Sequence, residues 1–177
     1  SIKTGDGIFA ADPGPGIIHI VGMSGHGKTT LMADLIKKLK ELGIRAGTIK
    51  HSAHSHELDI EGKDSHTHRM AGANPAAVIS RDLSAVFIEN SSATDRYAQI
   101  MPMFSHCDLV LIEGDKSATG IKLEVWRAEK GGRPLAETPD PGILAVITDD
   151  PVAPGIVSWK RSDVGALAAG IRKLILA

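Results

Sequence analysis

The sequence of 177 residues has few aromatic side chains, one cysteine and no long apolar run. Aromatic residues make up 3% of the chain, which argues against surfaces that stack nucleic-acid bases. The lone cysteine, Cys107, cannot form an internal disulfide, as is typical of proteins in a reducing compartment. No apolar run approaches the roughly 20 residues of a membrane-spanning helix, and no signal-peptide pattern opens the chain. We therefore expect a cytoplasmic protein that binds neither membrane nor nucleic acid.

Charge is balanced along the chain. The 20 basic and 21 acidic residues give a net charge of −1, so no bulk attraction to nucleic acid or to an anionic membrane is expected. With 42% hydrophobic residues, a chain of this length should bury a substantial core. Residues 1–16 are rich in glycine and proline and are predicted to form an irregular arm. Residues 17–177 are predicted to form a single nucleotide-binding domain.

The stretch at residues 22–29 fits the pattern Gly-x4-Gly-Lys-[Ser/Thr] of a phosphate-binding loop. A strand-like apolar run, residues 17–21, precedes it, and a helical pattern from Lys28 to Leu42 follows, ending at a plausible Gly43 cap. The glycines let successive amide N–H groups converge on phosphate oxygens at the start of the helix. Lys28 is expected to bind the β- and γ-phosphates and the Thr29 hydroxyl to bind Mg²⁺. The nucleotide-binding residues predicted in this loop are Ser24, Gly25, His26, Gly27, Lys28, Thr29 and Thr30.

The succession of apolar runs predicts an α/β protein with a three-layer P-loop NTPase fold and a mostly parallel sheet. Further strands are expected at residues 44–50, 76–80, 85–89, 108–114, 122–127, 143–148 and 156–159. Further helices are expected at residues 68–72, at 93–104 and, capped by Ser162, up to Leu176. The unbroken apolar run at 108–114 indicates a strand buried on both faces, whereas alternation at 122–127 indicates a half-exposed strand.

Polar residues are expected at the carboxyl ends of these strands, where ligands bind in open parallel sheets. Glu113 closes the buried strand and can hold Mg²⁺ or its water, as a Walker-B acid does. Asp108 lies at the opposite end of that strand and is not assigned to metal. Asp149, after a late strand, could accept hydrogen bonds from the paired donors of guanine. A turn-forming Asp-Asp-Pro is an equal interpretation, because the usual Asn-Lys-x-Asp of GTPases is absent.

A polar segment, residues 51–69, follows the second strand. We expect Lys50 and His51, together with His54, Asp59 and Lys63-Asp64-Ser65, to reach the γ-phosphate and the metal if this segment folds over the nucleotide. The segment also contains the histidines His51, His54, His56, His66 and His68. Because imidazole suits zinc, nickel or copper, a transition-metal site and a merely solvated loop remain as alternatives.

Several of these motifs together resemble one family, the molybdopterin-guanine dinucleotide biosynthesis protein B (MobB). The matching pieces, in the family's order, are residues 24–31, Ile49-Lys50-His51 with His54 and Asp59, Gly62-Lys63-Asp64-Ser65, Arg69 with Ala71-Gly72-Ala73, residues 109–114 with Lys116, and residues 145–149. The resemblance implies a homodimeric P-loop protein that binds GTP and Mg²⁺. It also implies that Glu113 supports the metal and that Asp149 lies near the base. Asp115 departs from the family, which usually has an aromatic residue there.

The resemblance implies an accessory role in attaching GMP to molybdopterin, a transfer carried out by a guanylyltransferase partner, MobA. Weak GTP hydrolysis is expected, because neither an arginine finger nor a water-positioning glutamine is apparent beside the loop. A metallochaperone-type GTPase is the first alternative, based on the histidine-rich segment. A small-molecule kinase is the second, although the arginines of this chain are scattered singly and do not suggest a lid.

Overall fold

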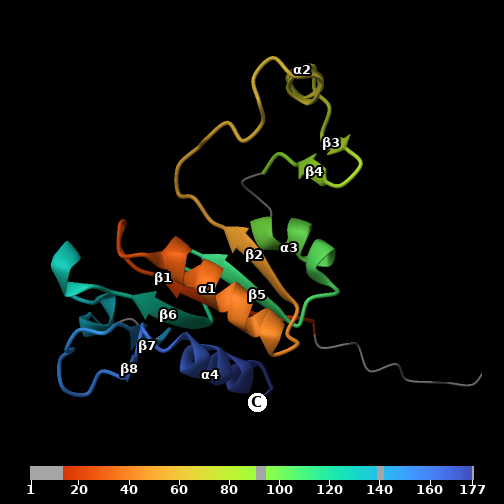
Figure 1. The fold of residues 1–177 in the computed structure, drawn as a ribbon. Helices are drawn as coiled ribbons and strands as arrows, with labels where there is room; N and C mark the ends of the chain where they lie inside the picture. Colours follow the sequence, from red (N-terminus) through yellow and green to blue (C-terminus); the bar gives the residue numbers. More distant parts are fainter. Residues whose placement is uncertain (1–13, 91–94, 139–141, 177) are drawn as a thin grey trace, which may run out of the picture. The chain divides into compact units, whose positions relative to one another are not determined.

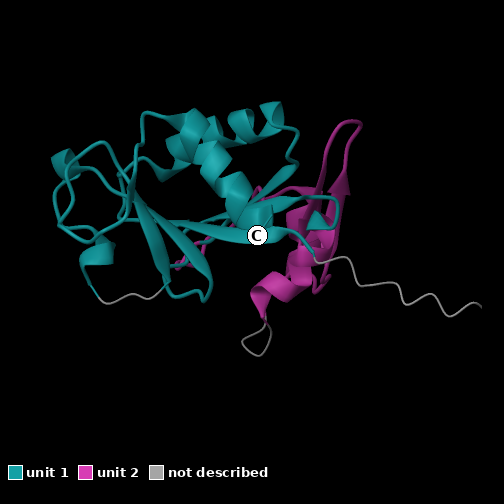
Figure 2. Cartoon of the chain, turned by 90° about the horizontal axis from the view of Figure 1, so that it is seen from below, with its two compact units in different colours: residues 1–51, 104–177 teal, residues 52–103 magenta. Residues whose placement is uncertain are grey.

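The computed structural model describes residues 14–90, 95–138 and 142–176, so most of the predicted arm and the start of the helix expected from Ala93 lie outside it. The chain divides into two compact units, residues 1–51 with 104–177 and residues 52–103 (Figure 2). We describe each unit by itself. The single domain expected for residues 17–177 stays a prediction. No helix in the described part of the chain is long and apolar enough to cross a membrane.

A six-stranded sheet forms the centre of the first unit (Figure 1). Its strands are β1 (Gly16–Val21), β2 (Ala46–Lys50), β5 (Leu109–Glu113), β6 (Ile121–Val125), β7 (Ile143–Ile147) and β8 (Ser158–Trp159). They are arranged in the order β2-β5-β1-β6-β7-β8, and every pairing is parallel. Every residue of β5 is buried, as its unbroken apolar run predicted. The predicted α/β fold with a mostly parallel sheet is confirmed.

Helix α1 (Lys28–Glu41) covers one face of this sheet through a leucine stripe. Leu31, Leu35 and Leu39 recur every four residues and are fully buried. Two lysines in the last turn complement the helix dipole. The helix ends before Gly43, whose φ of 76° is the left-handed conformation that glycine adopts most readily, so the predicted cap is confirmed.

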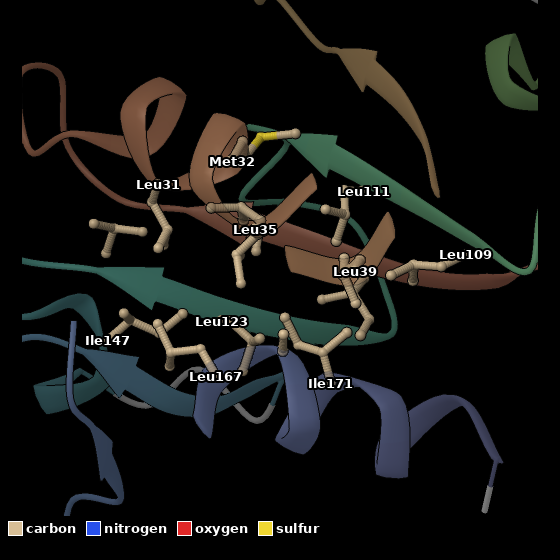
Figure 3. Close-up of a cluster of buried hydrophobic side chains, with 14 of the residues drawn as sticks. Leu31, Met32, Leu35, Leu39, Leu109, Leu111, Leu123, Ile147, Leu167 and Ile171 are labelled. Carbon is tan, nitrogen blue, oxygen red and sulfur yellow. The ribbon is translucent and has the colours of Figure 1, made fainter. Parts of the chain in front are cut away.

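Helix α4 (Val164–Leu176) packs beside α1 on the same core. Figure 3 shows leucines of α1 and Leu167 and Ile171 of α4 gathered in one cluster with side chains of β5, β6 and β7. The predicted Ser162 cap is wrong, because Asp163 occupies that position and its Oδ1 accepts a hydrogen bond from the Ala166 N–H at 2.9 Å. The Ser162 hydroxyl donates instead to Asp149 Oδ1 at 2.8 Å, so a tertiary contact decides between two adjacent capping residues.

Strand β6 is not half-exposed, contrary to the interpretation of its alternating sequence. It lies between β1 and β7, and its charged side chains, Lys122 and Glu124, are only 5% and 1% exposed. Glu124 accepts hydrogen bonds from the N–H groups of Leu135 at 2.6 Å and Ala136 at 3.0 Å, at the start of the short 3₁₀ helix η3 (Leu135–Glu137). Lys122 Nζ donates to the Lys116 carbonyl at 3.1 Å. Buried charges are tolerated here because they are hydrogen-bonded.

The amino end of β5 is held by an ion pair. Asp108 accepts hydrogen bonds from the Arg45 side chain, Nη2 at 2.7 Å and Nε at 3.1 Å, and from the Arg45 backbone N–H at 2.8 Å. Hydrogen bonds from the Arg45 guanidinium and backbone lower the pKa of Asp108 to about 2. Asp108 therefore lies where the sequence placed it, away from the carboxyl ends of the strands.

The second unit contains α2 (Asp64–Met70), β3 (Ala76–Ile79), β4 (Ser84–Phe87) and α3 (Arg96–Ile100). The predicted strand pair is confirmed as an antiparallel hairpin, closed by the Ser80 N–H donating to the Leu83 carbonyl at 2.8 Å. The helix predicted up to Phe104 changes after α3 to the 3₁₀ helix η1 (Met101–Phe104), because Pro102 supplies no N–H donor. Helix α2 begins at Asp64, earlier than predicted.

Large apolar side chains of the second unit are exposed. Leu58, Ile60, Ile79 and Leu83 are 82%, 67%, 81% and 75% exposed. Only Ser65 and Ala76 are buried among the described residues of this unit. A two-stranded hairpin is at best marginally stable in water by itself, so this unit gains little of its stability from a core of its own.

The buried carboxylate of Glu124 leads to a first prediction. Glu124→Ala should lower the free energy of unfolding by about 1–3 kcal/mol, because the Leu135 and Ala136 N–H groups lose their buried acceptor. Urea unfolding followed by circular dichroism measures this loss. Glu41→Ala is the control, since Glu41 forms an exposed pair with Lys38 and its removal should change stability by less than about 0.5 kcal/mol. Equal losses in the two variants would contradict the structural role of Glu124.

The Asp108–Arg45 pair predicts a pH dependence. Because the pKa of Asp108 is lowered in the folded state, its stabilisation is present above the ordinary aspartate pKa and is lost as the pH falls toward about 2. Asp108→Asn should therefore lower the melting temperature near pH 7, and the difference from the parent chain should vanish near pH 2. Thermal unfolding between pH 2 and pH 7 measures it. A difference that does not change with pH would exclude the ionised pair as its cause.

Candidate functional site

The strand order reverses around β1. Strands β5 and β2 lie on one side of it and β6, β7 and β8 on the other. In open parallel sheets, ligands bind outside the carboxyl ends of the strands at such a reversal. The loop of residues 22–29 leaves β1 at this point and leads directly into α1.

The backbone of this loop is shaped by its glycines. Gly22, Gly25 and Gly27 have φ values of 139°, 80° and 89°, which side-chain-bearing residues rarely adopt. A Cβ atom on Gly22 would also collide with the Val125 carbonyl oxygen at the end of β6. Because α1 starts immediately after Gly27, the unpaired N–H groups and positive dipole end of this helix lie in the loop, as an anion-binding site requires.

The Lys28 ammonium is hydrogen-bonded to the backbone of the loop. Its Nζ donates to the carbonyls of Gly22 at 2.9 Å and Met23 at 2.7 Å. Partial burial lowers the pKa of Lys28; the Glu113 carboxylate opposes this shift, and the charge of Lys50 adds to it. The amine group is therefore held among the backbone atoms of the loop by hydrogen bonds that a phosphate can replace.

Thr29, Glu113 and Lys50 meet at the carboxyl ends of adjacent strands. The Thr29 hydroxyl lies 3.1 and 3.2 Å from the two Glu113 carboxylate oxygens, and Lys50 Nζ contacts Glu113 Oε1. Lys50 is opposite Glu113 in the β2–β5 register, which places their side chains on the same face. A hydroxyl and a carboxylate are the oxygen ligands that Mg²⁺ prefers, so the residues present fit the predicted metal. An open hollow of about 220 Å³ adjoins them, walled mainly by Met32, Ala33, Ile36, Thr48 and Ile49.

His26 makes a contact that the sequence did not predict. It is only 2% exposed, and its Nδ1 accepts a hydrogen bond from the Arg127 backbone N–H at 3.0 Å. Burial lowers the pKa of His26, and the positive charges of Lys28, Lys130 and Arg127 lower it further. The residues lie 101 positions apart, so only the adjacency of β1 and β6 could have indicated this contact. The His26 imidazole is therefore held by the segment that follows β6.

The two aspartates after β7 hold loops. Asp149 Oδ1 accepts hydrogen bonds from the Ser162 N–H at 3.0 Å and from its hydroxyl at 2.8 Å, and the former contributes most to lowering the pKa of Asp149. Asp150 Oδ2 accepts from the Ala128 N–H at 2.8 Å. These bonds keep both carboxylates at the carboxyl end of β7. Recognition of a base by Asp149 stays a prediction.

His51 and Asp115 form a polar contact beside β5. The His51 N–H donates to the Glu113 carbonyl at 2.9 Å, and its Nδ1 lies 3.7 Å from Asp115 Oδ2. Asp115 has a φ of 58°, a left-handed conformation that aspartate tolerates better than most residues. Ser117 Oγ donates to Asp115 Oδ1 at 2.8 Å. The position where the family usually has an aromatic residue is thus part of a hydrogen-bonded polar turn.

Asp59 lies in the second unit and belongs to a network there. Its Oδ1 accepts hydrogen bonds from Ser65 Oγ at 3.0 Å and from the Ile60 N–H at 2.8 Å. Arg69 Nη1 lies 3.7 Å from Asp59 Oδ2 and donates to Glu57 at 2.8 Å, which lowers the pKa of Glu57 to about 2. Within the described ranges, no group of three or more His, Cys, Asp or Glu residues is placed to hold a metal ion. The role expected for Asp59 at the metal stays a prediction.

The parallel sheet and the glycine loop at its point of reversal define a P-loop protein of the nucleotide-binding class. Residues 17–149 match the model of the MobB family, described as molybdopterin guanine dinucleotide synthesis protein B. The chain belongs to this family, and the resemblance stated from its motifs is confirmed.

Two bacterial relatives share the chain's sequence over most of their length, and both are named molybdopterin-guanine dinucleotide biosynthesis adapter protein. The protein of Escherichia coli is 34% identical over 155 residues, which cover 86% of this chain and 89% of the relative. The protein of Haemophilus influenzae is 37% identical over 138 residues, which cover 77% and 76% of the two chains.

Solved structures of MobB proteins share the fold. A crystal structure of molybdopterin-guanine biosynthesis protein B aligns with a TM-score of 0.70 and 27% identity, covering 91% of this chain and 99% of that one. The structure of Bacillus subtilis MobB aligns with a TM-score of 0.69 and 24% identity, covering 89% and 97%. The fold prediction is thereby confirmed independently of the sequence motifs.

Proposed function

We propose that this chain is a GTP-binding adapter of molybdenum cofactor biosynthesis, acting in the cytoplasm. It would assist the conversion of molybdopterin to its guanine dinucleotide form, with the transfer itself carried out by a MobA-like guanylyltransferase. The observation that carries the proposal is the convergence of Thr29 on the Glu113 carboxylate beside the glycine loop. The names of the curated relatives supply the pathway.

In the proposed complex, GTP binds with its phosphates on the loop. The backbone N–H groups of residues 24–30 and the Lys28 ammonium bind the phosphate oxygens, while Thr29 and Glu113 hold Mg²⁺. When bound, Mg²⁺ neutralises charge on the β- and γ-phosphate oxygens. Lys50 supplies a second ammonium group at the same carboxylate, where it can bind the terminal phosphate. Asp149 would distinguish guanine from adenine by accepting hydrogen bonds from its donor edge.

Hydrolysis by the proposed adapter is weak and accessory. The chain contains one glutamine, Gln99, and it lies far from the glycine loop in the sequence. Groups that position water or stabilise the transferred phosphoryl group are worth about 10³–10⁵ in rate. Because no such group is apparent beside the loop in the sequence, we propose that GTP serves mainly as a bound ligand. Nothing in the names of the relatives favours the metallochaperone or the kinase alternative.

The proposed protein is a homodimer. Support comes from the second unit, whose large apolar side chains Leu58, Ile60, Ile79 and Leu83 are exposed. Exposed apolar groups on a unit with little core of its own are typical of surfaces that become buried on association. Sedimentation equilibrium should give twice the mass of the chain; a monomer at micromolar concentration would exclude the homodimer.

Lys28→Ala tests the nucleotide site. It should weaken GTP binding by roughly 100-fold, because charge-assisted hydrogen bonds to the phosphates are lost. Calorimetric titration with Mg²⁺ measures the affinity, and ATP titrated in parallel should bind more weakly than GTP. Lys37→Ala, an exposed lysine on α1, makes the same change in charge and should bind GTP as the parent chain does.

Two outcomes would reject parts of the proposal. Unchanged GTP affinity in Lys28→Ala would remove the loop from nucleotide binding, and equal affinities for GTP and ATP would remove base recognition by Asp149. The adapter role is tested by adding the chain to a MobA-type guanylyltransferase with molybdopterin and GTP. The parent chain should raise the yield of dinucleotide and Lys28→Ala should not. Stoichiometric nickel or zinc in the purified protein would favour the metallochaperone instead.

A further inference from the structure

The segment that follows β6, residues 126–132, is hydrogen-bonded both to the glycine loop and to the loop after β7. The Arg127 N–H donates to His26 Nδ1 in the glycine loop at 3.0 Å. The next residue, Ala128, donates its N–H to Asp150 after β7 at 2.8 Å. The Trp126 indole N–H closes the segment on itself by donating to the Gly132 carbonyl at 3.3 Å. The segment therefore lies between the phosphate-binding loop and the region where base recognition is proposed.

The contact with His26 places Arg127 directly against the loop. Since Nδ1 accepts the Arg127 N–H, the proton of the neutral imidazole is on Nε2. Burial and the neighbouring positive charges lower the pKa of His26 and favour this neutral form. His26 lies between Gly25 and Gly27, whose left-handed backbone is proposed to form the phosphate cradle. The backbone of Arg127 is thus one hydrogen bond away from that cradle.

The Arg127 guanidinium is only weakly held. Its Nη1 lies 3.3 Å from Glu129 Oε1, and the two side chains are 46% and 67% exposed. Exposed ion pairs of this kind contribute little, so a phosphate can compete with Glu129 for the guanidinium. Two other arginines of the same unit are held by hydrogen bonds to carboxylates, Arg45 by Asp108 and Arg161 by Asp34. Arg127, in contrast, has its backbone hydrogen-bonded to the loop.

We infer that Arg127 is a further nucleotide-binding residue, whose guanidinium binds the α- and β-phosphates. The inference rests on the proposed nucleotide function and deepens it. Thr29, Glu113 and Lys50, proposed for Mg²⁺ and the terminal phosphate, lie on the β5 side of β1, whereas Arg127 follows β6 on the other side. A cation on the β6 side of β1 would bind the phosphates nearer the base. A planar guanidinium can also bind phosphate oxygens in pairs, which an ammonium cannot.

The test compares GDP with GTP. Arg127→Ala should weaken both by a similar factor, roughly tenfold or more, because both nucleotides share the α- and β-phosphates. Calorimetric titration of the full chain with each nucleotide and Mg²⁺ measures the two affinities. The tether to His26 survives the substitution, since it uses the Arg127 backbone N–H. Arg127→Gln, which keeps a long polar side chain without the charge, should show the same parallel loss.

Arg133→Ala and Arg133→Gln are the matched controls. Arg133 follows the same segment, and its substitution changes the net charge by the same amount. The Arg133 side chain is 89% exposed, however, and its Nη1 lies 3.9 Å from Glu137 Oε2. Both control variants should bind GDP and GTP as the parent chain does. Equal losses in the Arg133 and Arg127 variants would reduce the effect to bulk charge and overturn the inference.

The remaining outcomes separate the inference from the function on which it rests. Unchanged affinity for both nucleotides in the Arg127 variants, with tight binding by the parent chain, overturns the inference alone. A loss confined to GTP assigns Arg127 to the terminal phosphate and also overturns it. A parent chain that binds neither nucleotide rejects the proposed function together with the inference. Unfolding midpoints of all variants within a few degrees of the parent establish that the losses are local.

Discussion

The insertion of β5 between β1 and β2 is the constraint on which the candidate site depends. Hydrogen bonds along both edges of β5 fix Glu113 opposite Ile20 on one side and Lys50 on the other. Residues at the same register present their side chains to the same face, so the carboxylate and the ammonium meet at the end of the sheet. The first turn of α1 brings the Thr29 hydroxyl to the same carboxylate. These side chains are positioned by rigid elements, which favours precise geometry.

Strand β6 makes the complementary contribution on the other side of β1. Its buried Glu124 binds the amides of η3, and the backbone of Arg127 after it binds His26. The loop of residues 22–29 therefore lies between the Glu113–Lys50 pair on one flank and the segment that carries Arg127 on the other. In the proposed complex, this arrangement would place the metal and the terminal phosphate toward β5 and the base toward β7.

Local sequence predicts well those elements whose conformation depends on neighbouring residues in the chain and not on distant ones. The glycine pattern, the leucine stripe of α1 and the apolar run of β5 each required no knowledge of distant residues. Burial of Lys122 and Glu124 could not be predicted, because alternating charged and apolar residues look the same whether the polar face meets water or a covering loop. Likewise Ser162 and Asp163 are both competent caps, and Asp149, distant in sequence, engages one of them.

Two backbone carbonyls of the phosphate loop would compete with a phosphate for the Lys28 ammonium. This ammonium donates to the carbonyls of Gly22 and Met23, which belong to the same loop. Phosphate binding is therefore an exchange in which one set of acceptors replaces another, and the free energy gained is the difference between them. Neutral carbonyls should lose that exchange to a polyanion but win it against weakly charged ligands. In the proposed function, the loop would therefore discriminate among ligands by anionic charge before any contact with a base is made.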